Sequence, residues 1–228
     1  RSGKTVDRLF VLDGCQDGPV KTILREAKKQ DTMVQYVKKE RLDQLSETKN
    51  HQGVIAYCAA CEYAEVSDIL ENAKKKGEAP FIVLLDGIED PHNLGAIIRT
   101  ANQAGAHGVI IPKRRAVGLT ATVARTSAGA VNYTPVAKVT NLVTVMEDLK
   151  KEGMWFVCAD MDGEEMYSLN LKGPIGLVIG NEGEGVSRLV KEHCDMVASI
   201  PMKGDIDSLN ASVAMGVLAY EIVRQRRF

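Results

Sequence analysis

Hydrophobic and polar positions alternate along the whole chain in blocks that have the lengths of strands and helices. In the first third, short apolar runs are separated by stretches with the helical period of about 3.6 residues. The pattern predicts a small α/β unit with strands at 8–12, 33–37 and 53–59 and helices at 19–29, 40–45 and 66–76.

A polar segment interrupts this pattern before the next apolar run. It starts in a lysine run and contains Gly77 and Pro80, which are typical of a helix end and a linker. We therefore expect a first domain at 1–76, a linker at 77–80 and a second domain at 81–228.

The second part shows longer alternation, and its strands are apolar almost throughout. Such strands separated by helices predict a parallel sheet with helices on both faces, which binds ligands beyond the carboxyl ends of its strands. The expected strands are 81–85, 108–111, 134–139, 155–159, 176–179 and 197–201, and the expected helices are 94–104, 120–127, 142–152, 185–194 and 208–227.

Composition narrows the class of protein. The chain has 228 residues, of which 45% are hydrophobic and 26% charged, as in ordinary globular proteins. Its longest apolar runs, 80–85 and 175–179, are too short to span a bilayer, so we expect no membrane association. The first residue is Arg1, and we expect the start to be trimmed.

Five cysteines, an odd number without framework spacing, indicate reduced thiols and a cytoplasmic location. The one close pair, Cys58 and Cys61, lacks the second pair or the histidines that a zinc site needs, so we expect no metal. A redox motif would lie at a helix start. We expect instead buried or half-buried thiols at a strand end.

The net charge of −1 gives no overall attraction to a polyanion. Any binding of nucleic acid must therefore depend on local basic clusters, although a single cluster is more often only a solvated surface. The clusters are 28–29, 38–41, 74–76, 113–115 and 224–227.

Three segments at strand ends contain the candidate chemistry. In the first, residues 90–101, Asn93 stands at a helix start, where its ordinary role is to cap free amides. Arg99 follows inside an apolar helix, where a charge is costly unless paired. A structural ion pair and a fork that holds a phosphate are equally good explanations of Arg99 at this point.

The second segment, 176–185, places glycines at 180, 183 and 185 around Asn181 and Glu182. This spacing is neither a dinucleotide fingerprint nor a phosphate loop, and its acidic residues would repel a pyrophosphate. A plain tight turn is one explanation, and a loop that contacts a polar ligand without phosphates is the other.

The third segment, 200–212, contains Ile200, Ser208, Leu209 and Asn210. Ser208 is a natural helix cap, but Asn210 and Ser212 add further polar groups at the helix start. The helix itself is apolar on more than one face, which predicts a second surface against it, such as another subunit.

Together these segments resemble the TrmH (SpoU) branch of the SPOUT methyltransferases over residues 81–228. The stretch from Asn93 to Ala101 is similar to the first family motif, 180–185 to the second, and 200–202 with 208–212 to the third. Residues 1–76 resemble the α/β ribosomal-protein-like RNA-binding domain of RlmB-type ribosomal RNA enzymes. The run Arg1 to Lys4 would then follow a first helix that is missing here.

The resemblance implies a deep trefoil knot in the second domain, a homodimer, and transfer of a methyl group from S-adenosyl-L-methionine to a ribose 2′-hydroxyl of a guanosine in 23S ribosomal RNA. It implies that Gly180, Ile200 and Leu209 bind the cofactor. It places a buried Arg99 at the target nucleotide, where it binds phosphate and assists deprotonation. Residues that orient Arg99 and the ribose would be Asn93, Glu182, Ser208 and Asn210.

Three other functions stay open at this point. A transfer RNA ribose methyltransferase is the nearest, and the extra first domain favours ribosomal RNA over it. A non-catalytic RNA-binding module is less consistent with the intact set of polar residues. A nicotinamide-dependent oxidoreductase would need the dinucleotide fingerprint, which the sequence lacks.

Overall fold

A computed structural model describes residues 5–15, 17–46, 48–206 and 208–228. The chain divides into two compact units, residues 1–62 and 63–228. The run Arg1 to Lys4, which the sequence places after a missing helix, lies outside the described residues.

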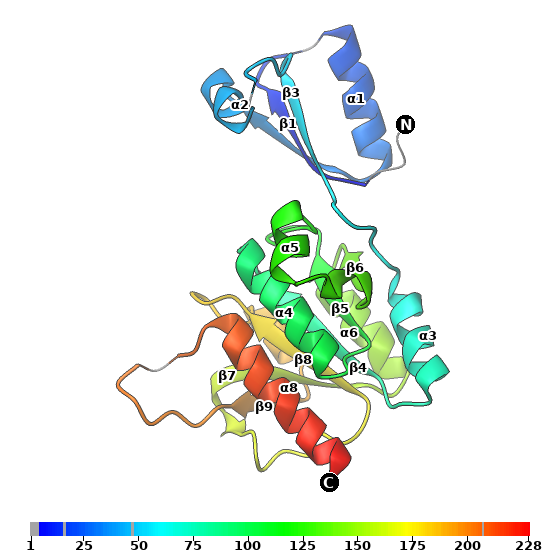
Figure 1. Ribbon diagram of the computed structural model, residues 1–228, viewed down its shortest axis with the longest axis vertical. Coiled ribbons are helices and arrows are strands. Elements are labelled where there is room, and N and C mark those ends of the chain that lie inside the picture. Colours follow the sequence, from blue (N-terminus) through cyan, green and yellow to red (C-terminus); the bar gives the residue numbers. More distant parts are fainter. Residues whose placement is uncertain (1–4, 16, 47, 207) are drawn as a thin grey trace. The chain divides into compact units, whose positions relative to one another are not determined.

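The first unit is a three-stranded sheet with two helices. In the order β2-β1-β3, the central strand β1 is parallel to β2 and antiparallel to β3. Figure 1 shows α1 and α2 on opposite sides of the strands. The elements are β1 Val6–Leu12, α1 Gly18–Lys29, β2 Met33–Val37, α2 Lys39–Leu45 and β3 Val54–Cys58.

Alternation along β1 decides which side chains face α1. Leu9 and Val11 point to one face and pack with Val20 and Ala27 of α1 in a small apolar core. Phe10, between them in sequence, therefore points to the opposite face. Leu42 of α2 is fully buried.

The second unit is built on a six-stranded parallel sheet, as the apolar strands predict. The strand order is β6-β5-β4-β8-β7-β9, so the direction of strand addition reverses between β4 and β8. Its elements are α3 Val66–Lys76, β4 Phe81–Asp86, α4 Pro91–Gln103, β5 Gly108–Pro112, α5 Ala121–Thr126, the 3₁₀ turn Ala130–Asn132, β6 Val136–Val139, α6 Leu142–Lys151, β7 Trp155–Glu165, β8 Ile175–Gly180, α7 Arg188–Glu192, β9 Met196–Ser199 and α8 Ala211–Arg227.

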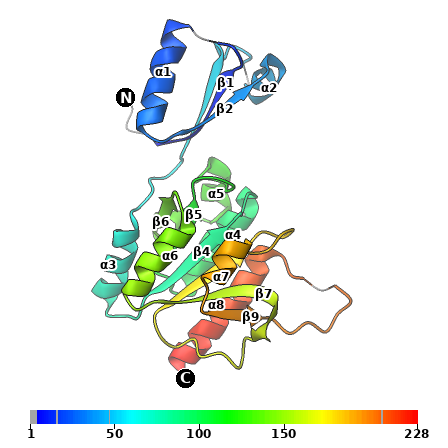
Figure 2. The same cartoon turned by 180° about the vertical axis from the view of Figure 1, so that it is seen from behind.

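Helices cover both faces of this sheet. Figure 1 shows α4, α5 and α8 on one face, and Figure 2 shows α3, α6 and α7 on the other. Burial on both sides explains why β4 has no polar residue before Asp86, since each of Phe81 to Leu85 is buried.

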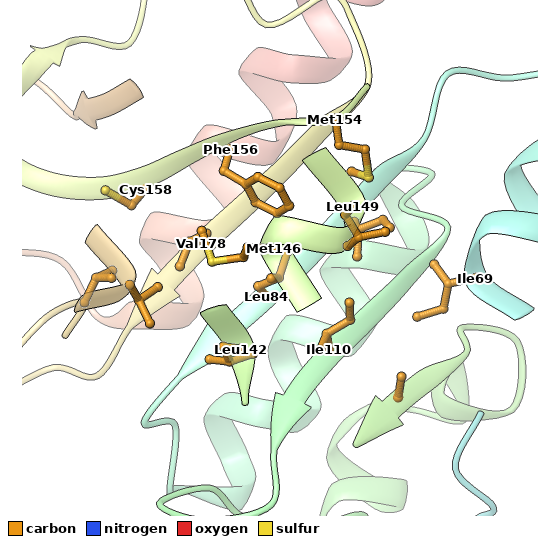
Figure 3. Close-up of a cluster of buried hydrophobic side chains, with 14 residues drawn as sticks. Ile69, Leu84, Ile110, Leu142, Met146, Leu149, Met154, Phe156, Cys158 and Val178 are labelled. Atoms are coloured by element: carbon orange, nitrogen blue, oxygen red, sulfur yellow. The ribbon is translucent and has the colours of Figure 1, made fainter. Parts of the chain in front are cut away.

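Side chains from α3, α6 and the central strands form the core on the second of these faces (Figure 3). Met146 of α6 and Phe156 of β7 are fully buried in it, as is Ile69 of α3. Gly108 of β5 leaves the space that Ile69 fills, because a Cβ there would lie 2.5 Å from the Ile69 side chain.

This packing places the division between the units earlier than the sequence predicted. We expected the linker at 77–80, after α3, but α3 buries its apolar side in the core of the second unit. The Gly and Pro of 77–80 are instead a turn between α3 and β4. Amphipathic periodicity shows that a helix has a buried face, but not which sheet covers that face.

The other boundaries lie within three residues of their predicted positions, except the end of β7. Strand β7 continues to Glu165, beyond the predicted end at 159, because its second part pairs with β9 after a register shift. Helix α7 is only Arg188–Glu192, and α8 starts at Ala211 rather than at 208. In the described part of the chain, no helix is long and apolar enough to cross a membrane.

Candidate functional site

A cavity of about 260 Å³ lies at the carboxyl ends of β8 and β9 and beside the middle of β7, on the edge of the sheet where parallel sheets bind ligands. It is lined by residues 159–161 of β7, by the ends of β8 and β9, by the loop 180–185 and by residues of the segment 200–214. The predicted residues in its wall are Gly180, Glu182, Ile200, Ser208 and Leu209.

A chain of hydrogen bonds connects the three segments that the sequence singled out. The amide nitrogen of Asn93 donates to the carboxylate of Glu182. The amide nitrogen of Asn210 donates to Oδ1 of Asn93 over 3.0 Å, and Oδ1 of Asn210 accepts from the Ser212 hydroxyl over 2.6 Å. Four polar side chains from α4, from the loop after β8 and from the start of α8 therefore form one network.

Asn93 is the centre of this network and is buried, with 9% of its surface exposed. The ordinary role of an Asn at a helix start would be capping, but Asp90 caps α4 by accepting from the amide of His92 over 3.1 Å. Both the nitrogen and the oxygen of the Asn93 side chain therefore form hydrogen bonds with other segments, at positions 89 and 117 residues away in sequence.

The loop 180–185 closes tightly on itself, and this explains its glycines. A Cβ on Gly180 would lie 1.9 Å from the carbonyl carbon of Gly185, whose own φ of +68° is left-handed. Asn181 braces the turn from inside, because its Oδ1 accepts from the amides of Gly183 and Glu184 over 2.9 and 2.7 Å. The loop is therefore a tight turn and a wall of the cavity at once.

The third segment differs from the prediction at the start of α8. Asn210, not Ser208, caps the helix, because its Oδ1 accepts from the amide of Ser212 over 3.0 Å. Ser208 is exposed and lines the cavity, together with Leu209.

Arg99 does not lie where the sequence prediction placed it. We expected a buried guanidinium, but Arg99 is exposed on α4 and is not part of the cavity wall. Within the described ranges its side chain has no ion pair or hydrogen bond. The apolar residues beside it in sequence misled the prediction, because they face the sheet, α5 or α8 while Arg99 points outward.

The sequence reasoning missed the middle of β7, where its pairing with β9 shifts register. Ala159, Asp160 and Met161 line the cavity, and Lys191 of α7 binds the Asp160 carboxylate over 2.7 Å. Partial burial acts to raise the pKa of Asp160, but the hydrogen bonds from Lys191 and from the amide of Asp162 outweigh it and hold this pKa below its usual value. A carboxylate directly after the predicted end of the strand at 159 was the available signal.

A second cavity of about 540 Å³ lies on another side of the loop 180–185 and shares Glu182 and Glu184 with the first. Its further walls are the end of β4 with the turn after it, one arginine, and the residue before α7. These residues are Asp86, Gly87, Glu89, Asp90, Arg115 and Ser187.

Other candidates are isolated in the structure. Cys58 is exposed at the end of β3 and Cys61 is half-buried, and no helix starts at either, so the predicted burial of the pair is wrong for Cys58. The described residues contain no group of three or more His, Cys, Asp or Glu side chains placed to hold a metal ion.

Comparison with known proteins shows the family of the chain. The profile of the SpoU rRNA methylase family matches residues 80–220, and that of an RNA 2′-O ribose methyltransferase substrate-binding domain matches residues 1–64. The chain belongs to the SpoU rRNA methylase family.

Relatives of this SpoU family member extend over both units. The chain is 49% identical to the putative TrmH family tRNA/rRNA methyltransferase YacO of Bacillus subtilis, over 99% of this chain and 91% of that one. Among solved structures, an AdoMet-bound rRNA methyltransferase from Sinorhizobium meliloti has a TM-score of 0.65 at 25% identity, over 97% of this chain and 81% of that one. The A. aeolicus TrmH/SpoU tRNA modifying enzyme has a TM-score of 0.60 at 28% identity, over 70% of this chain and 84% of that one.

The family makes the protein an S-adenosylmethionine-dependent RNA 2′-O-methyltransferase, and the first cavity fits that cofactor. Gly180 contributes only backbone to the cavity wall, and Ile200 and Leu209 contribute apolar side chains of the kind that suit an aromatic base. The carboxylates of Asp160 and Glu182 would repel a pyrophosphate, but they suit a cofactor that has a sulfonium, an ammonium group and hydroxyls but no phosphate.

Proposed function

We propose that this enzyme methylates the ribose of a guanosine in 23S ribosomal RNA, with its S-adenosylmethionine in the first cavity. The observation that carries the proposal is the network of Asn93, Glu182, Asn210 and Ser212, which joins the three family segments beside that cavity. A transfer RNA target is the alternative.

The first unit favours ribosomal over transfer RNA. The rRNA methyltransferase from Sinorhizobium meliloti matches 97% of the chain, whereas the tRNA modifying enzyme from A. aeolicus matches 70%. A substrate-binding profile covers residues 1–64, which agrees with a relative that matches the chain over both units. We place the reaction in the cytoplasm, where bacterial ribosomes are assembled.

The second cavity supports guanosine as the acceptor nucleotide. It shares one loop with the cofactor cavity, so a nucleotide in it would lie next to the methyl donor. Ionised carboxylates only accept hydrogen bonds, and Glu89, Glu182 and Glu184 border this cavity. Guanine offers two neighbouring N–H groups to such an acceptor, and uracil only one.

When bound, S-adenosylmethionine supplies a methyl group that its sulfonium has already activated. The protein's own contribution is then chiefly positioning, which can supply about 7–11 kcal/mol of the barrier. In our proposal the backbone at Gly180 and the side chains of Ile200 and Leu209 hold the cofactor. Asn93, Glu182, Ser208 and Asn210 orient the ribose and fix the geometry at the acceptor oxygen.

We propose that Arg99 binds the phosphate of the target nucleotide. Its exposure and its lack of a described partner leave the guanidinium fork available to a phosphate, and disfavour the structural ion pair. An arginine stays protonated in proteins, so Arg99 would assist by favouring negative charge on the ribose oxygen as the proton leaves.

The experiment for this role is Arg99→Ala, with Arg188→Ala as the control at an exposed arginine on α7. We expect unchanged affinity for S-adenosylmethionine by calorimetry and a fall in methyl transfer of about 100-fold or more, since the nucleotide is no longer held in line. Equal loss of cofactor binding and transfer would contradict the role. Mapping of ribose methylation in ribosomal and transfer RNA from cells without the protein decides between the two substrates.

We further propose two features of the assembled protein. One is a homodimer that forms on the outer side of α8, where the side chains of Val213 and Tyr220 are 49% and 51% exposed. The other is a trefoil knot in residues 81–228. Supporting it, the chain passes from α7 on one face through the edge strand β9 to α8 on the other face (Figures 1 and 2).

A further inference from the structure

The sheet of the first unit has one face that its helices cover only in part. On this face one row of side chains crosses all three strands, because Arg8 of β1 is in register with Met33 of β2 and with Tyr57 of β3. The next row contains Gln35, Phe10 and Ile55. Arg8, Gln35 and Tyr57 are called the platform below.

Tyr57 is an aromatic side chain that is held in place but not covered. Its ring meets Phe10 edge to face, with the ring centres 5.3 Å apart and the planes at 84°. Phe10 is only 5% exposed and therefore provides a fixed support, while Tyr57 remains 43% exposed. A ring that is braced at its edge keeps a flat surface available to a ligand at little cost in side-chain entropy.

The neighbours of Tyr57 on the platform add the groups that a nucleotide needs. Arg8 is half-buried, and its side chain has no ion pair or hydrogen bond with another residue in the ranges 5–15, 17–46, 48–206 and 208–228. Gln35 is exposed two residues along from Met33. An aromatic face stacks on a base, a guanidinium binds a phosphate, and an amide pairs with a base edge.

We propose that the platform binds single-stranded RNA, with a base stacked on Tyr57 and Arg8 against an adjacent phosphate. The inference rests on the proposed function in that it gives the first unit of an RNA methyltransferase its contact with substrate. It goes further by specifying unpaired nucleotides, because only a base that has left its stack can lie flat on an exposed ring.

The chain contains a matched control. Tyr36 of β2 is also an exposed tyrosine of the first unit, at 57%, but its register with Val11 puts it on the opposite face of the same sheet. The substitution Tyr36→Ala removes the same kind of side chain and leaves the platform unchanged.

The experiment measures fluorescence anisotropy of the full-length protein with a labelled single-stranded RNA decamer of mixed sequence and with the same decamer as a duplex. For the single strand we expect Tyr57→Ala to raise the Kd by about 5- to 150-fold, as loss of one base stack does. Tyr57→Trp should restore binding, and Tyr36→Ala should change the Kd by less than about 2-fold. Duplex binding should be the same for all four proteins.

Two features of the experiment distinguish loss of the stacking contact from loss of folding, and failure of this proposal from failure of the proposed function. Tyr57→Leu keeps an apolar contact with Phe10 but has no flat ring, so it should bind RNA as weakly as Tyr57→Ala while its melting temperature stays near that of the unmodified chain. Single-strand binding unaffected by Tyr57→Ala, or weakened equally by Tyr36→Ala, would overturn the proposal. RNA binding is measured without methyl transfer. An enzyme that binds RNA but transfers no methyl group would therefore refute the proposed function, while the comparison of Tyr57→Ala with Tyr36→Ala would still test the platform.

Discussion

Gly180→Ala tests whether the closure of the loop 180–185 builds the cofactor cavity. The added Cβ would lie 1.9 Å from the carbonyl carbon of Gly185, 2.1 Å from its oxygen and 2.2 Å from the amide of Val186. All three are backbone atoms, so no side chain can rotate away. Since real Cβ contacts are essentially never below 3.0 Å, the loop must retreat by about 1 Å or more.

That retreat would break the bridge in which the Gly185 amide donates to the Asn181 carbonyl over 3.1 Å. It would also move Glu182 away from Asn93 and widen the cavity. The overpacking costs about 1–3 kcal/mol, which a protein of ordinary stability, about 5–15 kcal/mol, survives. We therefore expect a folded protein with a misplaced cofactor wall, about 10-fold or more weaker in cofactor affinity and about 100-fold slower in methyl transfer.

The control is Gly183→Ala in the same loop. A Cβ there meets only the Asn181 Oδ1 at 3.6 Å, which is an ordinary contact, and Gly183 does not have a left-handed φ. Calorimetry with S-adenosylmethionine, together with thermal melting, compares the two variants. Normal cofactor affinity in Gly180→Ala, or equal loss in both variants, would refute the link between loop closure and cofactor binding.

Two further predictions concern stability and assembly. His107 is fully buried, its Nδ1 accepts from the Phe81 amide over 3.0 Å and its Nε2 donates to Glu78 over 3.0 Å. Burial lowers the pKa of His107 from 6.5 despite Glu78, so the contribution of His107 to the free energy of unfolding should be constant above about pH 6.5 and should fall as the pH drops from there to the lowered pKa. Urea unfolding of His107→Gln should lose this part of the pH dependence, and retention of the full slope would show another origin. Val213→Glu with Tyr220→Glu should turn a dimer of 24.8 kDa chains into monomers in sedimentation analysis, whereas Tyr133→Glu, at a site that is 80% exposed, should stay dimeric; dimers in both would place the interface elsewhere.

The order of strands and helices could be predicted from local pattern alone, because each element contains its own evidence. The continuous apolar run of β4 indicated a strand buried on both faces, and the carboxyl ends of such strands predicted where a ligand binds. Asn93, Glu182 and Asn210 could be proposed because polar groups at strand ends and helix starts are conspicuous against apolar neighbours.

The sequence pattern could not predict which residues far apart in the chain contact each other. Asn93 meets Glu182 and Asn210 across 89 and 117 residues, and a pairing at that separation depends on the sheet order rather than on any local signal. The same limit explains the two errors. Helix α3 packs on the sheet that follows it in the chain and not on the sheet that precedes it, and Arg99 points outward from a helix whose neighbouring residues face inward.

The sequence by itself thus determined which segments are strands, which are helices, and which residues carry polar chemistry, since these depend on side-chain type and spacing over a few residues. Only the tertiary structure decided which faces are covered, that Asn210 rather than Ser208 caps α8, and that Asp160 joins the cavity wall. Those outcomes depend on the packing of elements far apart in the chain, where burial is shared between surfaces that no local window contains.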